Sequence, residues 1–266
     1  MSVLVIGAYG SVGSHVVTGL LSAGASVRGA SRKPKPGALP DAVEMVRLDL
    51  DEPETLPAAL EGVEKVFLYA NPGSAVDFAT AARAAGVEHV VLLSSASVVE
   101  PTLQNSRSAK EHSAVEKALQ ESGIAWTFLR PTTFATKQLS WAPAIRAGEL
   151  LRIPFLHGQA ASIHERDIAD VAVRTLTDAG HEGQGYWLTG PEALTQQEHI
   201  DTIAAVIGKS IDVVEDTEPK WPPFLIQTMK QLMKEPCVVT PAVEEITGVP
   251  ARSFRQWAED HAKDFS

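Results

Sequence analysis

The sequence is poor in cysteine, with Cys237 alone among 266 residues. One thiol cannot close an internal disulfide, so the chain is not a disulfide-stapled scaffold, and a reducing compartment is expected. The stretch "EPCVVTPAV" gives Cys237 no basic neighbour to lower its pKa. This favours a small apolar residue over a nucleophile.

Long apolar runs and an excess of basic residues are also missing. The N-terminal "MSVLVIGAYG" has no charged leader and too short an apolar run for a signal peptide, and no run approaches the length of a membrane span. Lys and Arg number 23 against 33 Asp and Glu, a formal net charge of −10, which argues against a nucleic-acid partner. We expect a cytoplasmic protein with neither a membrane nor a nucleic-acid partner.

Several catalytic signatures are absent as well. The eight histidines and the single cysteine show no metal-ligand spacing, so no metal is expected. There is no Gly-x-Ser-x-Gly elbow and no Walker loop. These absences disfavour metallohydrolase, serine-hydrolase and nucleoside-triphosphatase chemistry.

The first half of the sequence alternates apolar strands with helical patterns. Such alternation predicts an α/β fold with a Rossmann-like, doubly wound parallel sheet covered on both faces. Prolines 34, 36 and 40 predict a surface loop rather than a linker. The expected strands lie within 2–8, 25–31, 42–50, 63–72, 87–97 and 124–131, and the expected helices within 14–24, 55–62, 75–86 and 110–123.

After Pro131 this rhythm breaks. Residues 132–162 read as irregular, and a helix follows over 165–180 with Asp167 as a plausible N-cap. Thr195 and Glu198 are spaced as a capping box for the next helix. A strand at 186–191 and helices at 221–233 and 254–265 complete the pattern. We expect an NAD(P)-binding domain over 1–133, to which helix 166–179 returns, and a smaller α/β substrate-binding part over 134–266.

The strongest motif is "GAYGSVG", which follows an expected strand and opens an expected helix. Gly7 permits the tight turn, Gly10 lets the backbone approach a pyrophosphate, and Gly13 lets the helix pack on the sheet. The helix N-terminus then offers N–H groups to the phosphates. The alternative is a glycine-rich turn with no ligand. The candidate cofactor residues here are Gly7, Ala8, Tyr9, Gly10, Ser11, Val12 and Gly13.

The end of the second strand predicts the cofactor type. An NAD-selective site places a carboxylate there, whereas this chain has Ser31, Arg32 and Lys33. Two cations suit a 2′-phosphate, so NADP(H) is favoured over NAD(H). The alternative is that Arg32 and Lys33 are solvated loop charges.

Other strand ends are expected to line the same crevice, because ligands bind outside the carboxyl ends of parallel strands. Asp49 could instead cap the following turn, and Ser94 could simply begin a loop. The candidates at these ends are Asp49, Leu50, Ala70, Asn71, Pro72, Ser94, Ser95, Pro131 and Thr132.

Several segments, in order, resemble the NmrA-like atypical short-chain dehydrogenases/reductases. They include "VLVIGAYGSVGSHVV", "VRLDLDEPETLPAALEGVEKVFLYANP", "AAGVEHVVLLSSAS", "LQESGIAWTFLRPT" and "RDIADVAVRTLTDAGHEGQGYWLTGPEALT". The branch they are most similar to contains bacterial NAD(P)H:quinone oxidoreductases and triphenylmethane-dye reductases. The resemblance implies a Rossmann-like domain whose strand ends contact cofactor and a C-terminal part that closes the substrate pocket. The superfamily also contains redox-sensing regulators.

The tyrosine acid of conventional members is missing. They carry Tyr-x-x-x-Lys after the fifth strand, but none of the three tyrosines here has a lysine four residues on. The corresponding helix has His112 and Glu116 at that spacing. His112 could act as the proton donor with Glu116 orienting it, or the two could form a space-filling pair. Bound water or a backbone N–H could also stabilise the charge developing on oxygen.

The pocket wall is expected from two segments rich in aromatic residues, 132–143 and 155–164. An apolar, aromatic wall suits a flat conjugated substrate, although ordinary core packing is the alternative, above all for Trp141. His164 precedes "ERD" and is expected at the surface. The candidate substrate residues are Phe134, Lys137, Trp141, Phe155 and His157.

These features favour an NADPH-dependent reductase acting on a quinone, enone or similar conjugated small molecule. One alternative is a non-catalytic NADP-binding regulator that senses redox state through a protein partner. Another is a specialised biosynthetic enzyme of the same fold. Either a monomer or a homodimer is compatible with the sequence.

Overall fold

The chain forms two compact units, described here from a computed structural model covering residues 1–35 and 37–266. The first unit comprises Met1–Pro131 and Ile168–Trp187, and the second Thr132–Asp167 and Leu188–Ser266. Pro34 and Pro40 are exposed and outside helices and strands, as expected for a surface loop, whereas Pro36 lies outside the described residues.

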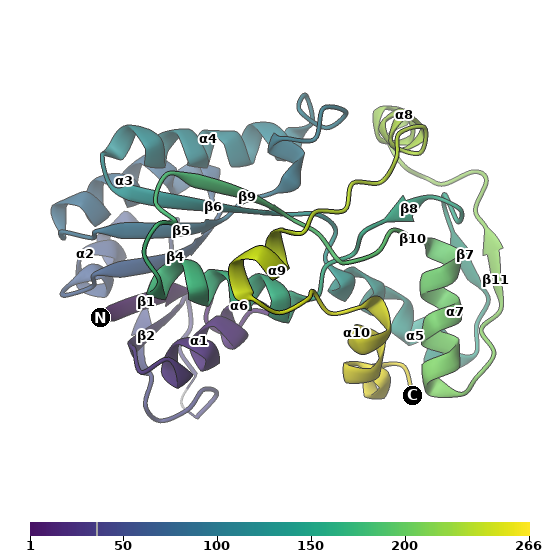
Figure 1. Cartoon of the computed structure of the whole chain (residues 1–266), viewed down its shortest axis with the longest axis horizontal. Helices are drawn as coiled ribbons and strands as arrows, with labels where there is room; N and C mark the ends of the chain where they lie inside the picture. The colour runs from purple at the N-terminus through teal and green to yellow at the C-terminus, as the bar shows by residue number, and fades with distance from the viewer. Residues whose placement is uncertain (36) are drawn as a thin grey trace. The chain divides into compact units, whose positions relative to one another are not determined.

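The first unit is built on a seven-stranded sheet of order β3-β2-β1-β4-β5-β6-β9 (Figure 1). The pairs β1–β2, β2–β3, β1–β4, β4–β5 and β5–β6 are all parallel. This confirms the Rossmann-like prediction, and the strand order reverses next to β1, where the glycine motif begins. The strands are β1 (Ser2–Ile6), β2 (Ser26–Ser31), β3 (Glu44–Arg47), β4 (Lys65–Tyr69), β5 (His89–Leu93), β6 (Ala125–Pro131) and β9 (Gln184–Leu188).

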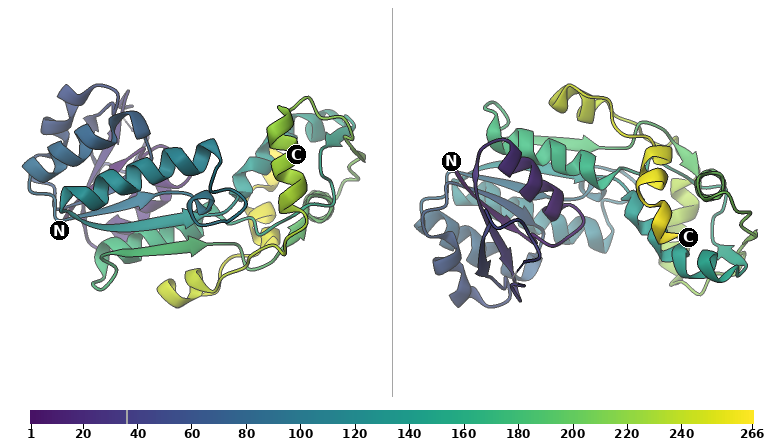
Figure 2. Two further views of the ribbon diagram at one scale, coloured as in Figure 1. Left: turned by 90° about the horizontal axis from the view of Figure 1, so that it is seen from above. Right: turned by 90° about the horizontal axis from the view of Figure 1, so that it is seen from below.

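Helices cover both faces of this sheet. Helices α3 and α4 lie against each other on one face, with α2 beside α3, while α1 and α6 share the opposite face (Figures 1 and 2). Gly19 of α1 leaves room for Val173 of α6, because a Cβ at this glycine would lie 2.7 Å from that side chain. The helices are α1 (Gly13–Ser22), α2 (Leu56–Leu60), α3 (Ala75–Ala84), α4 (Arg107–Ser122) and α6 (Glu165–Thr177).

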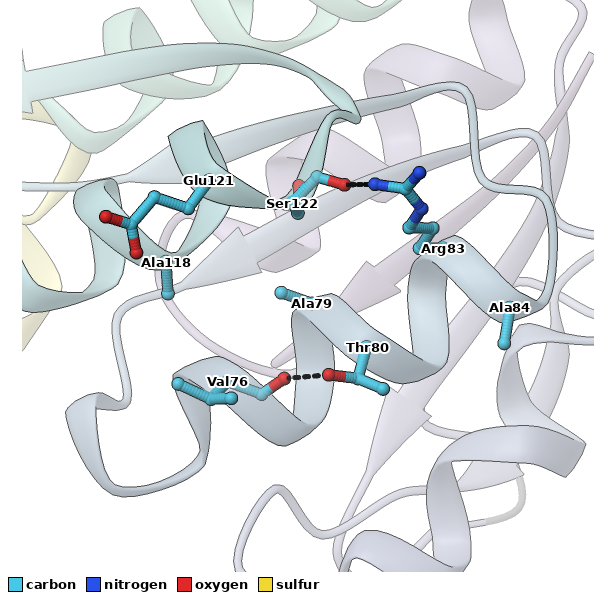
Figure 3. Close-up of a pocket in the computed structure, with 8 residues that line it drawn as sticks. All are labelled: Val76, Ala79, Thr80, Arg83, Ala84, Ala118, Glu121 and Ser122. Carbon is cyan, nitrogen blue, oxygen red and sulfur yellow. Dashed lines mark hydrogen bonds between the residues drawn. The ribbon is translucent and has the colours of Figure 1, made fainter.

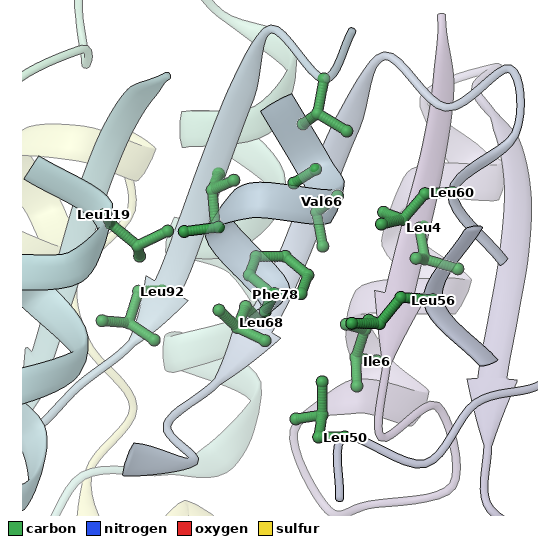
Figure 4. Close-up of a cluster of buried hydrophobic side chains, with 14 of the residues drawn as sticks. Leu4, Ile6, Leu50, Leu56, Leu60, Val66, Leu68, Phe78, Leu92 and Leu119 are labelled. Carbon is green, nitrogen blue, oxygen red and sulfur yellow. The ribbon is translucent and has the colours of Figure 1, made fainter. Parts of the chain in front are cut away.

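The core between the sheet and helices α2 to α4 follows from the apolar pattern of the sequence (Figure 4). Leu4 and Ile6 of β1 meet Leu56 and Leu60 around α2. Val115 and Leu119 of α4 are buried four residues apart, as expected for the inward stripe of a helix. Burial of these side chains fixes the ends of the strands that carry the candidate site.

The second unit contains more regular structure than its sequence predicts. Residues 132–162 include 3₁₀ helix η4, helix α5 and strands β7 and β8, so the expectation of an irregular segment is wrong. Pro143 lies in the first turn of α5, and Gly148 ends it with φ 66°. The elements are η4 (Ala135–Trp141), α5 (Ala142–Ala147), β7 (Leu151–Ile153), β8 (Gln159–Ala160), β10 (Leu194–Thr195), α7 (Gln196–Ile207), β11 (Val213–Glu215), α8 (Pro223–Leu232), α9 (Ala242–Thr247), α10 (Phe254–Asp260) and η5 (Ala262–Asp264).

A separate apolar core holds the second unit together. Trp257 and Phe254 of α10 stack with ring centroids 5.1 Å apart and pack with Ile200 and Ile203 of α7. The predicted capping box of Thr195 and Glu198 is present at the start of α7, which confirms that prediction. Among the described residues, no helix is both long and apolar enough to cross a membrane.

Helix α6 begins where its expected range begins, but Asp167 does not cap it. It starts at Glu165, so Asp167 lies inside its first turn and is not the N-cap. The buried Asp167 carboxylate instead accepts a hydrogen bond from the backbone N–H of Arg252 at 2.8 Å and pairs with the Arg252 guanidinium. A partner 85 residues away along the chain could not be read from local spacing.

Candidate cofactor and active site

The glycine motif forms a tight turn between β1 and α1. Gly7 has φ 77°, a left-handed conformation that favours glycine, and the Tyr69 ring approaches within 3.3 Å of where a Cβ would stand. At Gly13, a Cβ would overlap with the carbonyl oxygen of Gly7. The loop and the first turn of α1 are therefore packed as closely as backbone atoms allow.

The same loop leaves backbone donors available. Gly10 donates to the Gly7 carbonyl at 2.8 Å, and Ser14 donates to the Gly10 carbonyl at 3.0 Å. Within residues 1–35 and 37–266, the N–H groups of Ser11 and Val12 have no hydrogen-bond acceptor. They lie at the N-terminus of α1, where the helix dipole favours an anion. This arrangement fits the pyrophosphate of a dinucleotide.

The end of β2 presents positive charge with no compensating acid. Ser31 is the last residue of the strand, and its hydroxyl accepts a hydrogen bond from the backbone of Lys33 at 3.3 Å. Arg32, Lys33 and Lys35 are exposed. No ion pair joins any of the three to a carboxylate in the part of the chain that the structure describes.

The ends of β3 and β4 are linked by polar side chains. Asp49 accepts a hydrogen bond from the backbone of Asp51 at 3.2 Å, so it does cap the following turn. Asn71 donates to the Asp51 carboxylate at 3.0 Å and accepts from the backbone of Gly73 at 3.1 Å. Leu50 is buried in the core, whereas Ala70 and Pro72 flank Asn71 at the strand end.

Tyr69 is a residue of this region that the sequence reasoning missed. Its ring packs against the Gly7 turn, and partial burial raises the pKa of its hydroxyl. The Arg32 cation opposes that rise, while Asp49 and Asp51 add to it. Tyr69 therefore lies within electrostatic reach of both the basic loop after β2 and the acidic turn after β3. Tyr69 is the last residue of β4, the strand that pairs with β1 ahead of the glycine motif, and this position could have identified it as a candidate site residue.

Glu116 has partners other than those expected. Its carboxylate receives two hydrogen bonds from the Arg130 guanidinium, at 2.9 and 2.7 Å, and one from the Ser94 hydroxyl at 2.6 Å. Glu116 is buried, with 5% of its surface exposed. The prediction that Glu116 orients His112 therefore differs from the structure, in which this carboxylate ties α4 to the ends of β5 and β6.

His112 is oriented by its own helix. Its Nδ1 lies 2.8 Å from the carbonyl oxygen of Ser108, one turn earlier. A carbonyl can only accept, so Nδ1 donates its proton to this hydrogen bond, and Nε2 is the ring nitrogen that remains free to meet a ligand. Among the described residues, Nε2 has no hydrogen-bond partner, and the side chain is half-buried. This geometry is suited to giving or taking a proton at Nε2.

A row of serine hydroxyls leads from the end of β5 towards this histidine. Ser97 donates to the Ser95 hydroxyl at 2.9 Å, and the Ser97 and Ser108 hydroxyls lie 3.1 Å apart. Ser95 also caps a short 3₁₀ helix, η3 (Ala96–Val98), by accepting from the backbone of Ser97. The structure thus brings Ser95 and His112, two predicted site residues, into one polar cluster.

The last strand-end candidates fall on either side of the boundary between the units. Pro131 closes β6 and is buried. Thr132 belongs to the second unit, where its backbone donates to the Leu188 carbonyl at 2.9 Å and its hydroxyl to the Ala161 carbonyl at 2.8 Å. Its side chain thus has a structural role within that unit.

The predicted substrate residues all belong to the second unit. Trp141 packs against the apolar core, as its core-packing alternative anticipated, Phe134 is half-buried, and Lys137 and His157 are exposed. Phe155 has φ 57°, the only positive φ at a described non-glycine residue. Its ring lies 5.8 Å, centroid to centroid, from Trp221, which the sequence reasoning did not include.

His164 lies in the interior of the second unit, so the expectation that it is at the surface is wrong. Only 1% of His164 is exposed, because its ring is enclosed between Glu165 and Asp260, with ring nitrogens 3.3 Å from each carboxylate. Burial acts to raise the pKa of the Glu165 carboxyl, but the nearby His164 ring and a hydrogen bond from His261 Nε2 at 2.8 Å lower it to about 2. The cluster anchors the C-terminal residues to the first turn of α6.

A surface groove of about 580 Å³ lies between α3 and α4, and no predicted site residue lines it (Figure 3). Arg83 donates to the Ser122 carbonyl, and Thr80 donates to the Val76 carbonyl, within its walls. It is lined largely by short side chains, and its charged residues, Arg83 and Glu121, are both exposed on the helix surface. It is not a candidate for the active site. Its lining is Val76, Ala79, Thr80, Arg83, Ala84, Ala118, Glu121 and Ser122.

Comparisons with known proteins agree with this geometry. Residues 7–179 match the family model described as NAD(P)H-binding. The chain is 38% identical to (4-alkanoyl-5-oxo-2,5-dihydrofuran-3-yl)methyl phosphate reductase of Streptomyces griseus and 35% identical to NAD(P)H azoreductase of Xenophilus azovorans, with 99% of each chain covered in both cases. Triphenylmethane reductase of Citrobacter sp. has the same fold, with a TM-score of 0.84, 22% identity and coverage of 99% of this chain and 100% of the other.

Proposed function

The chain belongs to the NAD(P)H-binding, NmrA-like family of atypical short-chain dehydrogenases/reductases, and on that basis we propose a reductase that uses NADPH to reduce a quinone, enone or similar conjugated small molecule. When bound, the cofactor supplies a hydride. The relatives named above are reductases, which favours turnover over a purely regulatory role.

The observation that carries the proposal is the pairing of an anion-binding loop with uncompensated cations. The donors of Ser11 and Val12 suit the pyrophosphate. Arg32 and Lys33 have no acidic partner among the described residues and follow a strand that ends in Ser31 rather than a carboxylate. A 2′-phosphate would supply the missing negative charge, which supports NADPH over NADH.

His112 is the proposed proton donor. Reduction of a conjugated carbonyl adds a hydride and one proton, and the proton goes to the oxygen or carbon on which negative charge develops. With Nδ1 held by the Ser108 carbonyl, a protonated His112 would give the proton from Nε2. Glu116 is committed to Arg130 and Ser94, so its proposed role is to hold α4 in place rather than to assist the imidazole.

Phe155 and Trp221 are proposed to bind the flat part of the substrate. Both rings are accessible, they lie in contact, and the left-handed backbone of Phe155 costs on the order of 1–3 kcal/mol. Strain of this kind persists where it presents a side chain for function. Phe134, Lys137 and His157 are kept as further candidates for the same wall, whereas Trp141 is assigned to the core.

A narrower candidate substrate is an unsaturated lactone that carries an acyl group and a phosphate ester. The 38% identity to the Streptomyces griseus enzyme, over nearly the whole of both chains, favours it. Such a ring has a C=C bond conjugated with carbonyl groups, so it belongs to the same chemical class as enones. It corresponds to a specialised biosynthetic enzyme of the same fold.

The first experiment is NADPH oxidation, followed by absorbance, with quinones, enones, azo dyes and a phosphorylated butenolide as acceptors. We expect turnover with NADPH well above that with NADH. Replacing Arg32 and Lys33 together by Gln is expected to weaken NADPH binding at least about tenfold while leaving NADH binding unchanged. Tight binding of NADP⁺ with no oxidation across the panel would contradict the proposed activity.

The proton donor is tested separately. The His112→Gln variant is expected to lower kcat about a hundredfold with little change in the affinity for NADPH. Lys117→Gln, an exposed change on the same helix, is the matched control. A His112→Gln enzyme with full activity would show that water or a backbone donor supplies the proton.

A further inference from the structure

Tyr9, inside the glycine motif, is joined to the basic loop that follows β2. The backbone N–H of Lys35 donates to the Tyr9 hydroxyl at 2.7 Å, and the same hydroxyl donates to the Lys35 carbonyl at 3.1 Å. One phenol therefore contacts both peptide groups of a single residue 26 positions further along the chain. The hydroxyl uses its one proton and a lone pair in doing so.

This contact is the loop's principal link to the rest of the first unit. The other hydrogen bonds that the described residues of 32–40 make are local: Lys33 to Ser31, Ala38 to Lys35, and Val43 to Pro40. Among the described residues, the Tyr9 hydroxyl makes the only hydrogen bonds between this loop and a distant segment. The loop carries Arg32, Lys33 and Lys35, and exposed cations on a loose loop are poorly placed to hold a ligand.

We propose that Tyr9 is a specificity-determining positioning residue, which holds the Arg32–Lys35 loop against the glycine motif so that its cations meet a 2′-phosphate. The inference rests on the proposed preference for NADPH. The Tyr9 ring is half-buried and has only two side-chain torsions, so it can fix the loop before the cofactor arrives. The glycine motif is the proposed site of the pyrophosphate, which NADP and NAD share. Through Tyr9 the same motif sets the position of the cations that meet the 2′-phosphate, which only NADP carries.

The proposal predicts an effect on selectivity and not on binding in general. Tyr9→Phe keeps the ring and removes the oxygen that bonds Lys35. We expect the affinity for NADP⁺ to fall about fivefold to tenfold, the scale of two lost hydrogen bonds, and the affinity for NAD⁺ to stay within about twofold. Calorimetric titration of the full-length wild type and variant with both cofactors gives the four constants.

A double-mutant cycle separates action through the loop from direct contact. In a chain that already carries Arg32→Gln, Lys33→Gln and Lys35→Gln, adding Tyr9→Phe is expected to cause no further loss of NADP⁺ affinity. Tyr186→Phe is the matched control, because it removes a hydroxyl of the same unit that bonds His181 at 2.8 Å. This control is expected to leave both affinities unchanged.

Each contrary outcome would contradict a different part of the proposal. Equal losses for NADP⁺ and NAD⁺ in Tyr9→Phe would mean that Tyr9 acts on the pyrophosphate loop, and the proposal would fall. An unchanged preference in Tyr9→Phe, or additive losses in the combined variant, would overturn the positioning role alone. A wild type that binds both cofactors equally would overturn the proposed cofactor preference itself, and the inference with it.

Discussion

At the scale of single residues, the glycine motif needs glycine at Gly13, because any side chain there would collide with backbone atoms of Gly7. Gly13→Ala would place a methyl group against the Gly7 carbonyl, which is backbone and cannot rotate away. We expect the turn to be displaced, with cofactor affinity at least about tenfold lower and unfolding free energy lowered by about 1–3 kcal/mol. Calorimetric titration and urea unfolding test both. Thr18→Ala, on the exposed face of the same helix, should change neither.

His199 is a residue whose replacement is expected to stabilise the protein. It is fully buried against Phe254, and neither ring nitrogen has a hydrogen-bond partner within the described residues. An unsatisfied buried polar group costs about 1–3 kcal/mol, so His199→Leu is expected to raise the unfolding free energy at pH 7 by about 1 kcal/mol. Urea unfolding measures this. A loss of stability instead would show that the imidazole packs better than leucine can.

At the scale of elements, α4 is docked by a charge pair and not only by its apolar stripe. Glu116 and Arg130 are largely removed from water and make two hydrogen bonds. Glu116→Gln would leave the guanidinium buried without its counter-charge, so we expect a loss of about 3 kcal/mol in unfolding free energy. Glu121→Gln, which breaks an exposed pair with Lys117 on the same helix, should cost less than about 0.5 kcal/mol.

The double variant distinguishes a charge effect from a packing effect. Glu116→Leu with Arg130→Met replaces both charges by apolar side chains, and such replacements are often neutral in stability. We expect it to recover most of the loss seen in Glu116→Gln. If the double variant is as unstable as the single one, the three-way contact with Ser94 would be what docks the helix.

The elements also show what could be predicted from the sequence and what could not. Strands such as β1 and β5, and helices ended by a glycine such as α4, follow from short apolar runs and local stop signals. Helix α5 has six residues and β7 has three, too few to show a period, so they depend on packing. Glu116 was misassigned for a related reason, because its partner Arg130 lies on the next strand.

At the scale of the whole molecule, each unit contains a buried histidine whose pKa is lowered, His89 in the first unit and His199 in the second. The Thr127 hydroxyl donates a hydrogen bond to the His181 carbonyl, so it can only accept from His89. The His89 Nε2–H therefore donates to Thr127 at 2.9 Å. Burial lowers the pKa of His89 to about 4 and that of His199 to about 4. The ordinary value is 6.5, so in both units the unfolded chain takes up a proton before the folded one does.

This arrangement fixes the sign of the pH dependence. Between pH 6.5 and about 4 the unfolded state binds up to two more protons, so the unfolding free energy falls as pH falls. His261, whose pKa is raised despite burial by hydrogen bonds to Glu165 and Asp264, acts in the opposite sense above pH 6.5. Glu165, with its pKa lowered to about 2, adds acid sensitivity only below its ordinary 4.5. Burial raises the pKa of Asp167, which acts in the opposite sense, and backbone hydrogen bonds lower the pKa values of Glu182 and Glu198, which act like Glu165. Carboxyl groups titrate mostly below about pH 5, so the two buried histidines dominate between about pH 6 and pH 5.

The final prediction concerns the slope of the unfolding free energy against pH. For the wild type we expect about 2.5 kcal/mol per pH unit between about pH 6 and pH 5, the value for roughly two protons. His199→Leu or His89→Gln alone should halve it, and the double variant should be nearly flat, since Gln can still donate to Thr127 and does not titrate. His157→Gln, at an exposed site, is the control and should leave the slope unchanged. Urea unfolding at several pH values gives each slope. A double variant with the wild-type slope would mean that the acid sensitivity originates in other groups, and that both histidines are accessible to protons in the folded chain.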